Sequence, residues 1–269
     1  MLFRSSVVLI KPSHYDDDGY VIRWFRSPMP ANSLASVYAL VADGAARQVL
    51  GPDVDIEVSA IDETNARVRL GEIIASFRRG EELGFVGLVG VQSNQYPRAL
   101  DIARPLRAAR IPVIIGGFHV SGMLAMFPGV TADLQEALDL GVTLFAGEAE
   151  GRMDQVLRDA AADRLAPIYN FVDDLPSLEG PVVPFLPGGR VRRTIQSVTS
   201  FDAGRGCPFQ CSFCTIINVQ GRKSRRRSPD DVERILRANW DEGIALFFIT
   251  DDNFARNKDW EAILDRIFA

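Results

Sequence analysis

The sequence predicts an α/β protein that begins with a doubly wound parallel sheet and continues into a second α/β unit. Over residues 6–162, short apolar runs alternate with segments of helical periodicity. A proline-rich stretch then interrupts this alternation, which starts again at residue 195. Apolar strands that alternate with helices are typical of a parallel sheet covered on both faces. We therefore predict a first domain at residues 1–162, a linker at residues 163–194 and the beginning of a second domain at residues 195–269.

Five strands and five helices are expected in the first domain. Apolar runs predict strands at residues 6–10, 85–91, 112–115 and 142–145, and the alternation of apolar and polar residues predicts another at residues 54–61. Helices are expected at residues 33–49, 64–79, 97–110 and 133–140, with a last one that ends near residue 162. Thr64 is the expected cap of the second helix, because a threonine oxygen accepts a hydrogen bond from the first turn. This order predicts a flavodoxin- or Rossmann-like sheet.

The second domain is expected to hold two strand–helix units. Strands are predicted at residues 195–201 and 245–250, and helices from Ser228 to Trp240 and from about Lys258 onward. Ser228 followed by Pro229 is typical of a helix start. A complete TIM-type (β/α) barrel needs about 200 residues or more, so we interpret residues 195–269 as the first part of such a barrel. We expect this chain to be inactive alone and the activity to belong to a longer parent.

Charge and hydropathy restrict the setting in which the protein works. Thirty lysines and arginines stand against 35 aspartates and glutamates, a net charge of −5, so the totals do not favour binding to nucleic acid or to an anionic membrane. The longest apolar runs, at residues 7–10 and 244–249, are much shorter than the roughly 18 residues of a membrane span. The first residues do not resemble a secretory signal. We expect a cytoplasmic protein without a membrane span.

All three cysteines, Cys207, Cys211 and Cys214, lie within eight consecutive positions after a predicted strand. An odd number of clustered cysteines indicates metal or redox chemistry rather than a disulfide framework. Short spacings and flanking glycines allow three thiolates to converge on one iron–sulfur cluster and leave one iron open. The alternatives are a zinc site or a chance cluster of buried cysteines. Zinc requires four ligands, and neither His14 nor His119 has a finger-like spacing from the loop.

The spacing Cys-x3-Cys-x2-Cys, with the aromatic Phe213 before the last cysteine, resembles the signature of the radical S-adenosylmethionine superfamily. The resemblance implies a 4Fe-4S cluster on the three cysteines, S-adenosylmethionine at the open iron, and an electron donor such as flavodoxin or ferredoxin. It implies contacts to S-adenosylmethionine from Phe213 and, after the second strand, from Asp251 and Asp252. The alternative for this second loop is that it only caps the following helix.

Three polar or glycine-rich loops follow strands of the first domain, where open parallel sheets bind ligands. They contain Ser93 and Asn94, Gly116 and Gly117, and Gly147 and Glu148. The arrangement resembles the cobalamin-binding domain that precedes the radical core in one class of the superfamily. The resemblance implies that these six residues bind cobalamin, residues 1–162 being the cobalamin-binding-like domain. The alternative is a flavodoxin-like module that has lost its ligand.

One histidine motif of cobalamin proteins is missing. The sequence has no Asp-x-His-x-x-Gly motif, which supplies a lower axial histidine in other cobalamin proteins. We therefore expect cobalamin to bind without a histidine ligand, and His119 to form hydrogen bonds within its loop.

A basic run at residues 222–227 carries five positive charges in six positions. We interpret it as a solvated segment ahead of a helix, and contact with a phosphorylated substrate or nucleic acid is the alternative.

The function implied by these resemblances is methyl transfer to an unactivated carbon of a small-molecule substrate. One alternative is a radical-mediated cyclisation or rearrangement without methyl transfer. The other is a non-catalytic protein that binds a corrinoid or senses redox state with its iron–sulfur cluster.

Overall fold

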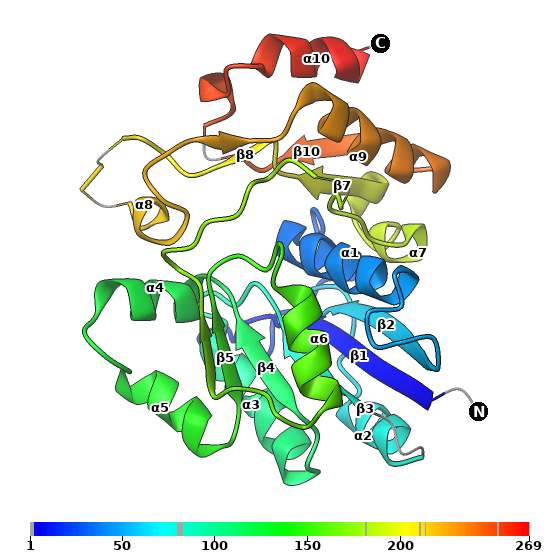
Figure 1. The fold of residues 1–269 in the computed structure, drawn as a ribbon, viewed down its shortest axis with the longest axis vertical. Helices are drawn as coiled ribbons and strands as arrows, with labels where there is room; N and C mark the ends of the chain where they lie inside the picture. The colour runs from blue at the N-terminus through cyan, green and yellow to red at the C-terminus, as the bar shows by residue number, and fades with distance from the viewer. Residues whose placement is uncertain are drawn as a thin grey trace.

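A six-stranded parallel sheet forms the larger part of the molecule in this computed structural model, which describes residues 3–79, 83–180, 182–209, 211–212, 214–251 and 253–268. Its strands are β1 (Phe3–Lys11), β2 (Val54–Asp62), β3 (Leu83–Leu88), β4 (Val113–Gly116), β5 (Thr143–Ala146) and β6 (Ile168–Asn170). They are ordered β2-β1-β3-β4-β5-β6 and all neighbours are parallel (Figure 1). This order confirms the predicted doubly wound fold class.

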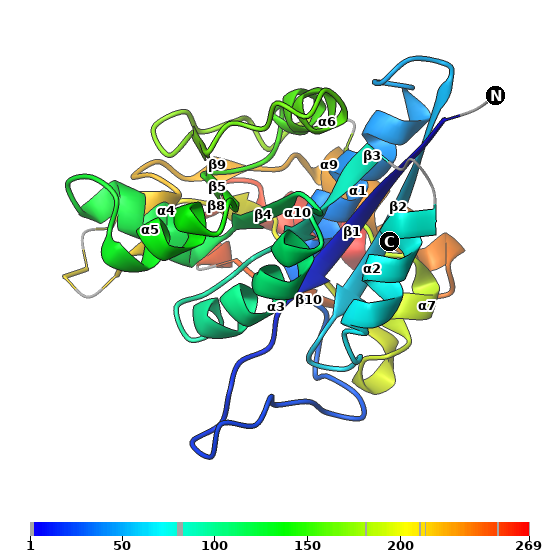
Figure 2. The ribbon, with the colours of Figure 1, turned by 90° about the horizontal axis from the view of Figure 1, so that it is seen from below.

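Helices cover both faces of the sheet (Figure 2). One face packs against α1 (Asn32–Ala46) and α6 (Met153–Ala161), and the other against α2 (Leu70–Arg79), α3 (Tyr96–Ala108) and α5 (Ala132–Asp139). Strand β1 shows why the sheet needs two layers of helices. Val7 and Leu9 belong to the core with α1 and α6, while Val8 and Ile10 belong to the opposite core, because successive strand side chains point to opposite faces.

Strands β1 to β5 confirm the five strands expected within residues 6–162. The sheet then continues into the segment expected to be a linker, where Ile168 pairs with Leu144 and Tyr169 with Phe145. The Tyr169 side chain is only 4% exposed and packs beside Phe145 and Phe171. A three-residue strand is too short to show a periodic pattern, which is why the sequence did not indicate it.

The expected helix start at Thr64 is wrong. Helix α2 begins at Leu70, and Thr64 lies in a turn where its backbone amide and its hydroxyl both donate to the Asp62 carboxylate, at 3.0 and 2.6 Å. Asp62 therefore satisfies the groups of Thr64 that would otherwise have capped a helix. A further helix, α4 (Phe118–Met126), follows Gly117 directly and was not expected.

The C-terminal region contains the two predicted strand–helix units. Its elements are α7 (Gly188–Val191), η1 (Ile195–Ser197), β7 (Val198–Phe201), β8 (Gly204–Arg205), α8 (Ile216–Val219), β9 (Arg225–Arg226), α9 (Pro229–Asp241), β10 (Leu246–Ile249), η2 (Phe254–Arg256) and α10 (Trp260–Phe268). β7 and β10 are parallel, and β8 pairs antiparallel with β9 on either side of the cysteine loop.

The predicted start of α9 is confirmed. The Asp231 amide donates to Ser228 Oγ at 3.1 Å, and the Ser228 amide donates to the Asp231 carboxylate at 3.2 Å. Pro229 occupies the first helical position. This reciprocal capping box fixes the helix end next to the basic run.

The two regions pack directly on each other. Leu186, Val191 and Ile244 extend the core that contains α1 and α6. Ser200 Oγ donates to the Pro30 carbonyl at 2.9 Å, and Asn32 Nδ2 donates to Asp202 Oδ1 at 2.6 Å. The carboxyl ends of the sheet strands consequently face the beginning of the C-terminal region (Figure 1). Across the part of the chain that the structure describes, no helix has both the length and the apolar character needed to span a membrane.

Candidate functional site

A cavity of about 720 Å³ lies at the carboxyl ends of β1, β3, β4 and β5. The chain order reverses at β1, which has β2 on one side and β3 on the other, and such a switch point is where open α/β sheets bind ligands. The C-terminal region closes the opposite side through Asp202, Arg205, Gln220 and Thr250. The volume is that of a small-molecule or cofactor site.

The deep part of the cavity is apolar. Side chains from the sheet, α1 and α6 line it: Leu9, Val37, Leu40, Phe85, Ile114, Phe145, Met153 and Val156. This apolar slot lies between the sheet and the α1–α6 layer. It suits a flat or elongated apolar group.

Five of the six residues predicted to bind cobalamin line the cavity: Ser93, Gly116, Gly117, Gly147 and Glu148. The sixth, Asn94, is exposed and is not among the lining residues. Gly117 has a φ of +142°, and a Cβ there would lie 2.2 Å from the Val91 backbone nitrogen. The glycine turn is therefore required for the β3 and β4 loops to meet at the cavity wall.

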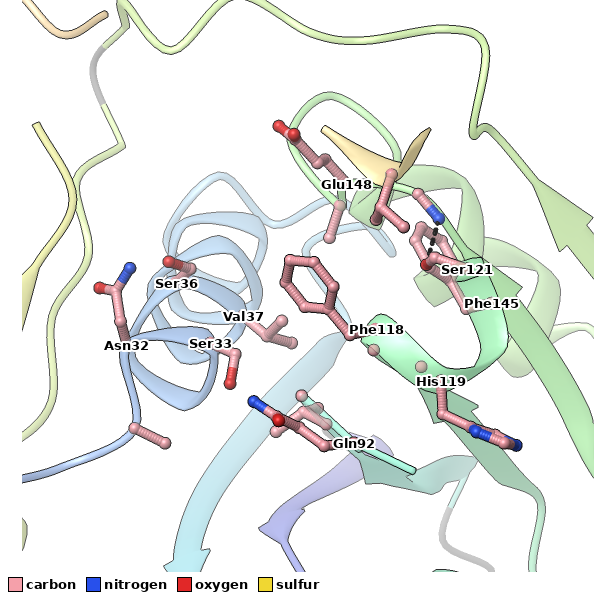
Figure 3. A pocket seen from close by; sticks show the side chains of 18 of the residues that line it. Asn32, Ser33, Ser36, Val37, Gln92, Phe118, His119, Ser121, Phe145 and Glu148 are labelled. Atoms are coloured by element: carbon pink, nitrogen blue, oxygen red, sulfur yellow. Dashed lines mark hydrogen bonds between the residues drawn. The ribbon is translucent and has the colours of Figure 1, made fainter. Parts of the chain in front are cut away.

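Phe118 and His119 open α4 and point in different directions (Figure 3). The Phe118 ring projects into the cavity, whereas the His119 ring points away from it. His119 Nε2 lies 2.7 Å from Asp133 Oδ2, and Nδ1 lies 3.1 Å from Ser93 Oγ. Both ring nitrogens are hydrogen-bonded, which confirms the expected hydrogen-bonding role, although His119 begins a helix and does not lie in a loop.

The carboxylate of Asp133 stays charged beside His119. Burial alone raises the pKa of Asp133, but hydrogen bonds from Thr131, from the Leu134 amide and from His119 outweigh it, and the pKa lies below its ordinary value. The His119 ring also packs on Tyr96, with ring centroids 4.1 Å apart. These contacts fix His119 as part of the cavity wall.

A buried ion-pair network joins the turn after β5 to the cysteine loop. Arg205 Nη1 donates to Glu148 at 2.9 Å, Nη2 to Glu150 at 2.8 Å and Nε to Asp202 at 2.9 Å. Arg225 donates to the same Glu148 carboxylate. Burial raises the pKa of Asp202, but Arg205 and Arg227 outweigh this and hold it below its ordinary value. The Glu148 carboxylate is thus held by two arginines at the cavity rim.

The interpretation of residues 222–227 as a solvated run is wrong for Arg225, which pairs with Glu148, and for Arg227. Arg226, whose side chain is 39% exposed, pairs with Asp259. Arg227 is 2% exposed and donates to the Asp202 and Leu178 carbonyls, both at 2.9 Å. Arg222 and Lys223 are exposed as expected. The distant carboxylates and carbonyls that bind these arginines are not visible in the local sequence.

The cysteine loop runs between β8 and α8, with free thiols at Cys207, Cys211 and Cys214. Cys211 is exposed and the other two are half-buried. The Cys207 amide donates to the Gly221 carbonyl at 3.2 Å, and the Cys214 amide to the Cys211 carbonyl at 3.1 Å. Within the described ranges, no three His, Cys, Asp or Glu side chains are arranged as a metal site, these cysteines included.

The donor set of this loop nevertheless fits an iron–sulfur cluster. It offers three thiols on one turn, and such a set leaves one iron open for a small ligand. A cation–π contact supports the loop from outside, with the Arg256 guanidinium 3.8 Å from the centre of the Phe209 ring. Phe213, predicted to contact S-adenosylmethionine, lies outside the described residues.

Asp251 lies at the end of β10, where its Oδ1 accepts a hydrogen bond from the Ala203 amide at 2.6 Å. This contact joins β10 to the segment that leads from β7 into the cysteine loop. Asp252, the second carboxylate predicted to contact S-adenosylmethionine, lies outside the described residues. Thr250, which precedes both, lines the cavity.

Sequence comparison assigns the C-terminal region to a family. Residues 202–269 match the Radical SAM superfamily. The chain is 27% identical over 198 residues to a bacteriochlorophyllide d C-8(2)-methyltransferase of Chlorobaculum tepidum, covering 67% of this chain and 41% of that protein. It is 38% identical over 86 residues to a cytidylyl-2-hydroxyethylphosphonate methyltransferase of Streptomyces wedmorensis, and this match covers 32% of this chain and 15% of that protein. The chain therefore spans less than half the length of these relatives.

Solved structures share the fold of both regions. TsrM from Kitasatospora setae, a radical S-adenosylmethionine methyltransferase with cobalamin and a [4Fe-4S] cluster bound, has a TM-score of 0.62 at 16% identity over 98% of this chain and 52% of its own. A second similar structure is OxsB, a cobalamin-dependent S-adenosylmethionine radical enzyme with aqua-cobalamin and S-adenosylmethionine bound. Its TM-score is 0.63 at 16% identity, and the match covers 98% of this chain and 36% of OxsB. Residues 202–269 thus match the Radical SAM superfamily, and the chain as a whole, with its sheet order β2-β1-β3-β4-β5-β6, shares the fold of these two solved structures.

Proposed function

We propose that this chain provides the cobalamin-binding region and the start of the radical core of a methyltransferase that methylates an unactivated carbon of a small molecule. One observation carries the proposal. The cavity at the carboxyl ends of the sheet is closed by the segment that bears the cysteine loop, so a ligand held by the sheet would lie beside a cluster held by the loop. The relatives named above are methyltransferases, which supports this reaction class.

The residues around the cavity suit a corrinoid. The apolar slot between the sheet and α1 would take the nucleotide tail, and the glycine turns at Gly116 and Gly147 would let a flat macrocycle approach the backbone. Because both ring nitrogens of His119 already have partners, the corrinoid would bind without an axial histidine. When bound, cobalamin would supply a methyl group to a carbon radical.

The cysteine loop would hold a 4Fe-4S cluster through Cys207, Cys211 and Cys214. S-adenosylmethionine would bind at the open iron, and the loop after β10, with Asp251 and Asp252, would approach it. Arg205 would keep the loop in position over the cavity through Glu148 and Glu150. An electron donor such as flavodoxin or ferredoxin would reduce the cluster.

The substrate class proposed is a small organic molecule, and the whole activity is proposed for a longer protein. This chain holds two strand–helix units of the radical core, and the missing units would line the substrate pocket. The 269-residue chain is accordingly expected to bind its cofactors but not to turn over. Robust S-adenosylmethionine cleavage by this chain would contradict that expectation.

Anaerobic reconstitution with iron and sulfide tests the proposal, with electron paramagnetic resonance and absorption spectra recorded with and without S-adenosylmethionine and hydroxocobalamin. A reduced-cluster signal that shifts with S-adenosylmethionine is expected, together with a bound corrinoid. The triple variant Cys207→Ala, Cys211→Ala, Cys214→Ala should lose the cluster and keep the corrinoid. Zinc at the cysteines, or no bound corrinoid, would contradict the proposal.

The two alternative functions predict different products from a full-length parent. With methyl-labelled S-adenosylmethionine, only methyl transfer places the label in the substrate. A cyclase or rearrangement enzyme would form 5′-deoxyadenosine and an unlabelled product. A redox sensor would form no 5′-deoxyadenosine.

A further inference from the structure

A lysine is buried in the wall of the cavity. Lys11 is the last residue of β1, lines the cavity and is 8% exposed. Its Nζ donates to Gln95 Oε1 at 2.6 Å and more weakly to the Pro12 carbonyl at 3.4 Å. Lysines are almost never this buried without a charged partner, so the position of Lys11 requires an explanation.

Lys11 has no anionic partner among the residues that the structure describes. None of the ion pairs among the described residues includes it, and Glu63, which follows the neighbouring β2, is paired with Arg98. Burial lowers the pKa of Lys11 to about 8, and the charge of Asp62 only partly offsets this. The other charged cavity residues, Glu148, Glu150, Asp202 and Arg205, form their own network. Within the described part of the chain, the two hydrogen-bond acceptors of the buried ammonium group, Gln95 Oε1 and the Pro12 carbonyl, are therefore both neutral.

The surroundings of Lys11 favour an anion. Gly90 has a φ of +61°, and a Cβ there would lie 2.0 Å from Ser33 Oγ and 3.5 Å from Lys11 Cδ, so this glycine brings the two side chains together. Ser33 lies in the first turn of α1, which contains no acidic residue and whose dipole favours negative charge. One turn further, Ser36 Oγ is buried beside the same cavity and has no hydrogen-bond partner among the described residues (Figure 3).

We propose that Lys11 binds the phosphodiester of the corrinoid's nucleotide loop, so that this cavity selects complete corrinoids over those that lack the phosphate. This inference rests on the proposed function, that the cavity binds a corrinoid. The side chains of the corrin ring are neutral amides, and the phosphodiester is the one fixed negative charge of cobalamin. Ser33 lines the cavity together with Lys11, and Gln95 holds the Lys11 ammonium group from behind through the hydrogen bond to its Oε1.

The proposal fixes the sign of a pH effect. The phosphodiester stays negative throughout the neutral and alkaline range, so its binding favours the protonated lysine and raises the Lys11 pKa above about 8. The affinity gain is therefore fully present below pH 8 and is lost as the pH rises through the raised pKa. No such loss is expected for a corrinoid without phosphate.

The test compares three corrinoids in the cobalt(II) state on the whole chain: cobalamin, cobinamide phosphate, which has the phosphate without the base, and cobinamide, which has neither. Affinities are measured anaerobically by absorption titration at pH 7 and pH 10. The wild-type chain should bind cobinamide phosphate about 10- to 100-fold more tightly than cobinamide at pH 7, as for one charge-assisted hydrogen bond. Lys11→Met should remove this difference and leave cobinamide affinity unchanged.

Two further variants complete the test. Lys11→Arg should keep the preference and lose its pH dependence, because arginine stays charged. Lys258→Met removes an exposed lysine and should change nothing. Equal weakening of all three corrinoids by Lys11→Met, or an undiminished phosphate preference in that variant, would overturn the proposal. Failure of every corrinoid to bind the wild-type chain would refute the proposed function instead.

Discussion

Arg205 Nη1 donates to Glu148 Oε2 at 2.9 Å, and this contact connects the turn after β5 with the strand that leads into the cysteine loop. The same guanidinium also contacts Glu150 and Asp202. One side chain, two positions before Cys207, thus connects both regions on the side of the cavity.

Replacing Arg205 with methionine should destabilise the chain strongly. The change leaves Glu148, Glu150 and Asp202 buried with one fewer cation, and breaking such a buried pair costs about 3–5 kcal/mol. Urea denaturation followed by circular dichroism measures the loss. Arg222→Met is the matched control, because Arg222 is exposed and should change the free energy of unfolding by less than about 0.5 kcal/mol. Similar values for the two variants would contradict the structural role of Arg205.

The network should also make stability depend on pH on the acid side. Burial raises the pKa of Glu150, but the charge of Arg205 outweighs it, and the pKa values of Glu150 and Asp202 both lie below their ordinary range. The stability that these two ionised carboxylates give to the fold is therefore fully present above about pH 4, the carboxyl pKa in the unfolded chain. It is lost as the pH falls through their lower pKa values in the folded chain. Denaturation between pH 2.5 and pH 7 should show this fall. The slope of the unfolding free energy against pH measures the number of protons taken up on unfolding. In Glu150→Gln this slope should be smaller by up to one proton, which is about 1.4 kcal/mol per pH unit. An unchanged slope would exclude Glu150 from the network.

Gly117 should tolerate no side chain. A Cβ at this position would lie 2.2 Å from the Val91 backbone nitrogen, and φ is +142°. We expect Gly117→Ala to cost about 4 kcal/mol or more, in the range of severe core lesions. Gly129 separates the cost of the positive φ from the cost of the close contact. Its φ is +82°, but no atom lies within 4 Å of a Cβ added there. Gly129→Ala should cost only about 1–2 kcal/mol, and equal costs would show that the contact with Val91 does not matter.

His119 should stabilise the wall of the cavity and should not ligate the cobalt of a bound corrinoid. His119→Ala removes one hydrogen-bond partner from Asp133 and one from Ser93 and should cost about 1–3 kcal/mol of stability. The electron paramagnetic resonance spectrum of bound cobalt(II) corrinoid should lack nitrogen splitting in the wild-type chain and in the variant alike. Ser93→Ala, which removes one of the two contacts, should cost less. Nitrogen splitting that disappears in His119→Ala would mean that the ring turns to ligate cobalt.

Much of the sheet could be predicted because its inner strands are buried on both faces. The apolar runs of β1, β3, β4 and β5 are direct signs of such strands, the alternating sequence of β2 fits its place at the sheet edge, and Ser228 with Pro229 indicates the start of α9. The sequence does not predict helix α4, because its apolar residues are not confined to one helical face. Val120 is buried, whereas Met126 is exposed. The helix start expected at Thr64 is wrong because the neighbouring Asp62, and not a helix, satisfies the polar groups of Thr64.

The candidate site was predictable where it depends on strand ends and not where it depends on distant partners. The loops at Ser93, Gly116 and Gly147 meet at one cavity, as their positions after parallel strands implied. The local sequence predicts a solvated Arg225, because its partner, Glu148, lies 77 positions away in the sequence. The burial of Lys11 is not visible in the local sequence either, because its partner Gln95 comes from a distant loop.

The short pairing of β6 with β5 bears on how the molecule can be dissected. Residues 168–170 belong to the sheet by hydrogen bonding, and Phe171 beside them takes the Arg152 guanidinium over its ring at 4.8 Å. A recombinant N-terminal half that stopped at residue 162 would expose the β5 edge and the Phe145 side chain that Tyr169 covers. Limited proteolysis or truncation intended to isolate this half should therefore cut after Val172, where the strand and its aromatic neighbours remain with the sheet.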